Sequence, residues 1–120
     1  MEKLKDVKPS DEHCIMNPCI VNPITVYKRN PSMSLHAKAL YGILIDLLVY
    51  GDGWIDEDGE YFVEFSIYLA EMYLMCGVKT ANKVFDELEG KGLIRCEFRD
   101  GNASDTKQFI IYIQQHRENK

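Results

Sequence analysis

Residues 66–94 read SIYLAEMYLMCGVKTANKVFDELEGKGLI, and they contain two helix-forming segments separated by a Cys76-Gly77 break. Ser66 supplies an N-cap hydroxyl for the first segment, which extends to about residue 75. The second segment covers about residues 79–89, and the glycines that follow it end the helix. Its apolar positions recur at helical spacing and form one inward face: Ala81, Val84, Phe85 and Leu88. The stretch therefore predicts two short helices joined by a tight turn.

The residues that follow this helix pair favour a β-hairpin. Segments 93–98 and 108–113 are rich in β-prone side chains, and residues 99–106 between them are mostly turn formers. We expect the two segments to pair as strands, with the connecting residues as the tip of the hairpin.

The residues that precede the pair predict a long helix and two short strands. Ser32-Met33-Ser34 offers N-cap hydroxyls to residues 35–50, whose apolar positions recur at helical spacing. Residues 24–27 and 61–65 are short β-prone runs, each predicted as a strand. The complete order is typical of an α+β winged helix-turn-helix, with a three-helix core, a β-hairpin wing and a short additional strand.

The length of 120 residues is enough for one domain with a core of its own. Residues 1–23 are polar and broken by three prolines, so we expect an extended or partly disordered arm. The winged-helix domain is expected over residues 24–114, with a tail at 115–120. No stretch has the roughly 20 apolar residues of a membrane span, and the amino terminus lacks a signal-peptide core. We therefore expect a cytoplasmic protein without membrane contact.

A metal site or a catalytic site has little support in the sequence. The four cysteines form no C-x-x-C pair, and His13, Cys14 and Cys19 lack the paired spacing of a zinc site. The acidic residues of 52–60 do not follow the register of an EF-hand calcium loop. No nucleophile–histidine arrangement or phosphate-binding glycine loop is evident. We expect no enzyme activity, no cofactor and no bound metal.

The net charge of −5 is unevenly distributed along the chain. Residues 51–65 contain six acidic side chains and no basic one, whereas residues 78–108 contain six of each. The acidity is thus concentrated before the helix pair, whereas residues 78–108, which include the second helix and the hairpin, are neutral overall. This balance permits DNA binding but does not by itself argue for it.

In a winged helix the second helix of the pair enters the major groove, and the wing touches the neighbouring backbone. The outward residues of that helix suit these contacts, with Thr80 and Asn82 for base edges and Lys79 and Lys83 for phosphates. Asp86 marks the limit of contact. The wing adds candidate phosphate donors: Arg99, Asn102, Ser104, Thr106 and Lys107. Any amphipathic helix has a polar outer face, so a solvated surface is the alternative.

Four ordered motifs within residues 34–114 resemble the N-terminal domain of the replication initiator A family. They are LHAKALYGILID at 35–46, GWIDEDG at 53–59, YFVEFS at 61–66 and LEGKGLI at 88–94. The resemblance implies a winged helix that binds repeated sites at a plasmid origin, often as a dimer. It also implies that the DNA-binding residues lie on the second helix of the pair and on the wing.

The leading hypothesis is therefore the DNA-binding domain of a plasmid or mobile-element replication initiator that reads origin repeats in double-stranded DNA. We expect a homodimer formed through the arm and the 35–50 helix, which acts with host replication proteins. Two alternatives remain open: a transcriptional regulator of a mobile element, and a winged-helix protein-interaction module without DNA binding. The acidic balance, together with a wing that begins Arg99-Asp100-Gly101, motivates the last of these.

Overall fold

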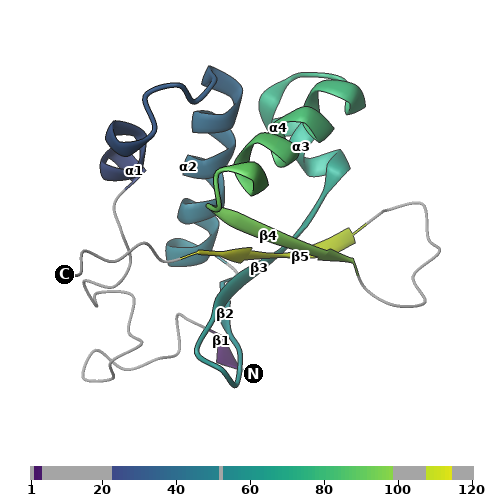
Figure 1. Cartoon of the computed structure of the whole chain (residues 1–120). Coiled ribbons are helices and arrows are strands. Elements are labelled where there is room, and N and C mark those ends of the chain that lie inside the picture. The colour runs from purple at the N-terminus through teal and green to yellow at the C-terminus, as the bar shows by residue number, and fades with distance from the viewer. Residues whose placement is uncertain (1, 4–22, 52, 99–107, 115–120) are drawn as a thin grey trace.

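The computed structural model describes residues 2–3, 23–51, 53–98 and 108–114. Within them four helices lie on one side of an antiparallel sheet (Figure 1). In chain order the elements are β1 (Glu2–Lys3), α1 (Pro23–Arg29), α2 (Leu35–Tyr50), β2 (Trp54–Ile55), β3 (Tyr61–Ser66), α3 (Ile67–Leu74), α4 (Val78–Gly90), β4 (Ile94–Phe98) and β5 (Gln108–Ile113).

The sheet has the strand order β1-β2-β3-β5-β4. β3 pairs with β5 along its whole length, from Tyr61 opposite Ile113 to Ser66 opposite Gln108. β4 and β5 form the predicted hairpin, and β4 lies at an edge of the sheet. β1 pairs with β2, so the first residues of the predicted arm join the sheet. The α+β winged helix-turn-helix is confirmed, the predicted strand at residues 61–65 is β3, and β2 is a strand that was not predicted.

α2 is the central helix of the core and has the predicted bounds. The Ser34 hydroxyl caps it by accepting the backbone N–H of Ala37 at 3.1 Å. Leu40, Leu44 and Leu48 recur on one side of the helix and are at most 1% exposed. α2 contacts α3, α4 and β3, so the helix-turn-helix rests on this apolar support.

The helix-turn-helix has the local structure that its residues predict. Ser66 caps α3 by accepting the N–H of Leu69, and α3 ends at Met75 in a left-handed conformation with φ 54°. Gly77 then occupies the N-cap position of α4. The predicted inward face of α4 is confirmed, since four side chains are at most 5% exposed: Ala81, Val84, Phe85 and Leu88.

The predicted strand at residues 24–27 is wrong, because this segment belongs to helix α1. Pro23 suits the first position of a helix, where its fixed φ is favourable and no N–H is needed. Val26 is buried in the core. The Tyr27 hydroxyl donates a hydrogen bond to the Lys38 carbonyl of α2 at 2.6 Å. These contacts with α2 outweigh the weak β preference of the Ile-Thr-Val-Tyr run.

Gly42 allows Tyr27 to approach the backbone of α2. A Cβ at Gly42 would lie 3.1 Å from the Tyr27 hydroxyl oxygen, which is a tight contact. Burial raises the pKa of Tyr27, and a backbone hydrogen bond from Gly42 offsets part of that rise. The phenol is therefore held between α1 and α2.

We predict that Gly42→Ala gives no gain in stability in the wild-type background, because the new methyl group crowds the Tyr27 hydroxyl. In a Tyr27→Phe background the same change should raise the free energy of unfolding by about 1 kcal/mol, the usual helix preference for alanine over glycine. Urea denaturation of the four proteins checks this double-mutant cycle. An equal effect of Gly42→Ala in both backgrounds would contradict the contact.

We predict a large loss of stability for Gly53→Ala. A Cβ there would overlap the Leu48 carbonyl oxygen and lie 2.8 Å from the Leu48 Cα, and neither backbone atom can move easily. The free energy of unfolding should fall by about 2–3 kcal/mol. The control is Gly90→Ala, where a Cβ meets nothing within 4 Å. Equal urea midpoints for the two variants would show that the Gly53 site has room to relax.

Candidate nucleic-acid interface

The charges of α4 are divided between its two halves. Residues 78–83 include Lys79 and Lys83 and no acidic side chain, whereas Asp86, Glu87 and Glu89 follow in the second half. The helix dipole is positive at the N-terminal end, so it adds to the attraction that the lysines exert on an anion. The N-terminal half therefore suits a polyanion, and the C-terminal half does not.

The predicted reading residues lie together in this cationic half. Lys79, Asn82 and Lys83 are exposed, and Thr80 is partly buried. Within the described part of the chain, no hydrogen-bond or ion-pair partner lies near these four side chains. Their polar groups are thus available to a ligand. The wing candidates lie outside the described residues: Arg99, Asn102, Ser104, Thr106 and Lys107.

The acidic half of α4 attaches the helix to the rest of the domain. The Glu87 carboxylate accepts hydrogen bonds from the backbone N–H and the hydroxyl of Ser34, each at 2.8 Å. Ser34 is also the cap of α2, so one carboxylate joins α4 to the central helix. One turn later, Lys91 Nζ donates to the Ser32 hydroxyl at 3.1 Å. These contacts fix the position of the C-terminal end of α4.

Glu89 makes a second attachment, to the sheet. Its carboxylate accepts the backbone N–H of Cys96 at 2.9 Å and so occupies a donor on the edge strand β4. No sequence pattern indicates the roles of the two glutamates, because the partner of Glu87 lies 53 residues away. Burial, the nearby Glu89 charge and its hydrogen bond raise the pKa of the Cys96 thiol to about 12, so this thiol stays protonated.

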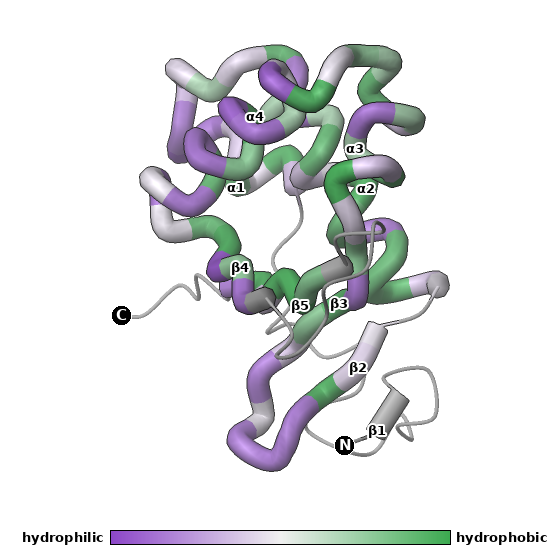
Figure 2. The backbone as a smooth tube through the Cα atoms, turned by 90° about the vertical axis from the view of Figure 1, so that its right-hand side faces the viewer, coloured by the Kyte–Doolittle hydropathy of each residue, from purple (hydrophilic) through white to green (hydrophobic). Residues whose placement is uncertain are grey.

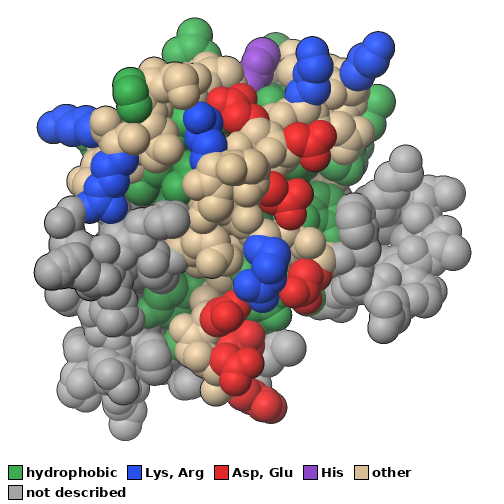
Figure 3. Space-filling view, viewed as in Figure 1, with side chains coloured by type: hydrophobic (Ala, Val, Ile, Leu, Met, Phe, Trp, Pro, Cys, Tyr) green, Lys and Arg blue, Asp and Glu red, His purple; other side chains and the backbone are tan. Residues whose placement is uncertain are grey.

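The remaining acidic groups lie mostly away from the start of α4. Figure 3 shows a band of acidic side chains running down one face from the helices to the β2–β3 turn. That hydrophilic turn lies at the opposite end of the molecule from α4 (Figure 2). Within the turn, the Asp56 carboxylate accepts the N–H groups of Asp58 and Glu60 at 2.9 Å. The acidic side chains of the β2–β3 turn are thus separated from the cationic end of α4.

Arg95 of β4 is a basic residue that already forms ion pairs with acidic side chains. Its guanidinium bonds Glu60 at 3.0 Å and Glu97 at 3.1 Å, and it lies 4.1 Å from the ring centroid of Tyr112. The hydrogen bonds and charges of the two carboxylates raise the pKa of Arg95, although burial lowers it. We do not assign Arg95 to the interface, because a phosphate would have to compete with both carboxylates.

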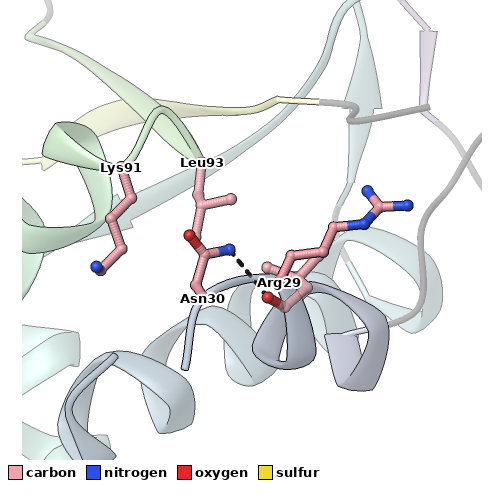
Figure 4. Close-up of a pocket in the computed structure, with 5 residues that line it drawn as sticks. Arg29, Asn30, Lys91 and Leu93 are labelled. Atoms are coloured by element: carbon pink, nitrogen blue, oxygen red, sulfur yellow. Dashed lines mark hydrogen bonds between the residues drawn. The ribbon is translucent and has the colours of Figure 1, made fainter. Parts of the chain in front are cut away.

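A small pocket of about 210 Å³ lies between the end of α1 and the residues that enter β4. It is lined by Val26, Arg29, Asn30, Lys91 and Leu93. In Figure 4 the charged ends of Arg29 and Lys91 point away from each other, and the Asn30 amide donates to the Val26 carbonyl at 2.9 Å. A compact anion needs donors that converge, so we assign no ligand to this pocket.

Among the described residues, no three His, Cys, Asp or Glu side chains are grouped closely enough to hold a metal ion. The alternative metal ligands His13, Cys14 and Cys19 lie outside those residues. In the same part of the chain, none of the helices has the length and apolar character needed to cross a membrane.

A family model described as "Replication initiator protein A (RepA) N-terminus" matches residues 22–120. The chain belongs to this family. The RepA resemblance of the four sequence motifs is therefore confirmed. No curated protein sequence gives a significant match.

Two solved structures share this RepA-type fold. One, described as "Structure of Rep-DNA complex", has a TM-score of 0.60 and 23% identity, and the match covers 84% of this chain and 76% of that chain. The other, described as "N-Terminal domain of DNA binding protein", has a TM-score of 0.60 and 22% identity, with 83% and 76% covered. At this level of identity the likeness establishes the fold.

Glu87 should make the stability of the domain depend on pH. Burial alone raises its pKa, but the two hydrogen bonds from Ser34 and the Lys91 charge outweigh burial and lower it. A lowered native pKa stabilises the fold above the unfolded value of about 4.3, and this stabilisation is lost as the pH falls through the native pKa.

We predict that Glu87→Gln lowers the free energy of unfolding at pH 7 by up to about 1 kcal/mol, because a partly exposed charge-assisted contact is weakened. The difference should shrink as the pH is lowered from 7 to about 3. Urea denaturation at the two pH values measures the difference, with Glu57→Gln on the exposed turn as the control. A constant difference across this range would contradict the role of the Glu87 charge.

Proposed function

We propose that this domain binds duplex DNA at the repeats of a plasmid or mobile-element replication origin, with α4 in the major groove. The observation that carries the proposal is the cationic, exposed N-terminal half of α4 within a helix-turn-helix of the RepA N-terminal family. The similar structure described as a Rep-DNA complex adds support from a protein of the same fold. The docking geometry is the usual one for this motif.

Each candidate residue has a role in this proposal. Lys79 and Lys83 contact phosphates and supply salt-dependent affinity, whereas Thr80 and Asn82 meet base edges and supply specificity. The wing binds the neighbouring backbone through its own donors: Arg99, Asn102, Ser104, Thr106 and Lys107. Asp86 opposes phosphate contact and limits the interface to the first turns of α4.

The proposal includes a homodimer formed through the arm and the region of α2. Leu35 and Tyr50, at the two ends of α2, are 83% and 80% exposed, and a second copy packed along α2 would cover both. The domain then acts in the cytoplasm, with host replication proteins, by binding rather than catalysis. A transcriptional regulator of the same element would use the same DNA contacts at a promoter.

Selection from a pool of random duplexes tests the proposal even though the recognised site is unidentified. The enriched duplex and a scrambled duplex are then titrated against the full chain by fluorescence anisotropy at two salt concentrations. We expect tight binding that favours the enriched duplex and weakens steeply with salt. No enrichment, together with weak binding to both duplexes, would favour the protein-interaction alternative. Enriched sequences that map to promoters, with none at origin repeats, would favour the transcriptional regulator.

We predict different losses for the two classes of contact. Lys83→Ala should weaken binding to both duplexes and reduce the salt slope by about one, because one phosphate contact is lost. Asn82→Ala should weaken only the enriched duplex, by about 1–3 kcal/mol. Lys28→Ala, which removes an exposed cation from α1, is the matched control. Unchanged affinity for both α4 variants would show that α4 is not the reading helix.

A further inference from the structure

The first turn of α4 exposes an apolar side chain beside the predicted reading residues. Val78 is the first residue of the helix and is 46% exposed. The predicted helix begins at about residue 79 and so leaves Val78 out. The available signal is Gly77, since glycine is an accepted N-cap residue and places position 78 inside the helix.

Val78 and Asn82 form a row along one flank of α4. They are four residues apart, so their side chains lie on the same side of the helix, about 6 Å apart along its axis. Lys79 and Lys83 form the adjacent row at the same spacing. In a groove, a cationic row faces the phosphates, and a neighbouring row of short neutral side chains can approach the bases.

The chemistry of this row matches an A·T pair. Thymine is the one base that presents a methyl group in the major groove, and an apolar side chain is its complement. Asparagine matches the N6 donor and N7 acceptor of adenine. Cytosine would call for a carboxylate acceptor, and residues 78–85 contain no acidic side chain.

We propose that Val78 and Asn82 read A·T pairs one or two steps apart, with Val78 against a thymine methyl group and Asn82 on an adenine. This inference rests on the proposed function of α4. The rise of about 6 Å between the two positions corresponds to roughly two base-pair steps of about 3.4 Å, so the two side chains reach pairs one or two steps apart. The contacts of Glu87 and Glu89 at the other end of α4 hold the row in place.

The test removes the same methyl contact once from the DNA and once from the protein. Each thymine of the enriched duplex is replaced in turn by uracil, which lacks only the C5 methyl group. At one position the wild-type affinity should fall about fourfold, the loss expected for one buried methyl group. Val78→Ala should bind the thymine duplex more weakly by a similar factor and should be insensitive to uracil at that position.

A second arm tests Asn82 in the same way. Each adenine of the enriched duplex is replaced in turn by 7-deazaadenine, which lacks the N7 acceptor, and at one position Asn82→Ala should abolish the effect of this replacement. The control is Ile24→Ala, which removes an apolar side chain of α1 that is 58% exposed. This variant should keep the full uracil effect. Urea denaturation verifies that each variant is folded.

The inference is overturned if uracil has no effect at any position, or if its effects are the same in the wild type and in Val78→Ala. Either result leaves the proposed function intact as long as the selection enriches a sequence and Lys83→Ala weakens binding. If no sequence is enriched, the proposed function fails, and the A·T inference fails with it.

Discussion

The aromatic contact of Phe85 with the sheet is the constraint on which the interface depends. Its ring meets Phe65 of β3 and Phe109 of β5 edge-on, with centroids 6.2 and 5.3 Å away. Because Phe85 lies in the middle of the buried face of α4, this packing fixes the rotation of the helix about its axis. The lysine row must then face outward. The outward position of the lysine row is thus a consequence of the packing of the opposite, apolar face of α4 against the core.

The two halves of α4 serve different purposes, and electrostatics explains why they are separated. Acidic side chains near DNA phosphates would cost affinity, and two of the three on α4 bind protein donors instead. Glu87 and Glu89 do this by accepting N–H and hydroxyl groups from the start of α2 and from β4. The cationic half is left with few competing charges. A chain with net charge −5 can in this way present a positive helix end.

Local support comes from polar groups at the helix ends rather than from long polar networks. Ser34 and Ser66 cap α2 and α3, and the Ser34 hydroxyl also donates a hydrogen bond to the carboxylate of Glu87. A small domain gains much from such contacts, because each satisfies backbone groups that burial would leave unpaired. The same capping serine thus sets the start of the central helix and the position of α4.

Local signals in the sequence were sufficient to predict the helix pair, α2, the β4–β5 hairpin and the buried face of α4, because capping residues and apolar spacing act within a few residues. The prediction of a strand at residues 24–27 failed, because the burial of Val26 and the hydrogen bond of Tyr27 to α2 stabilise a helix there. The hydrogen bonds of Glu87 and Glu89 could not be predicted from the sequence either. A carboxylate has no periodic pattern to reveal its partner, and the packing of α4 against α2 and β4 is what brings Ser34 and Cys96 to these side chains.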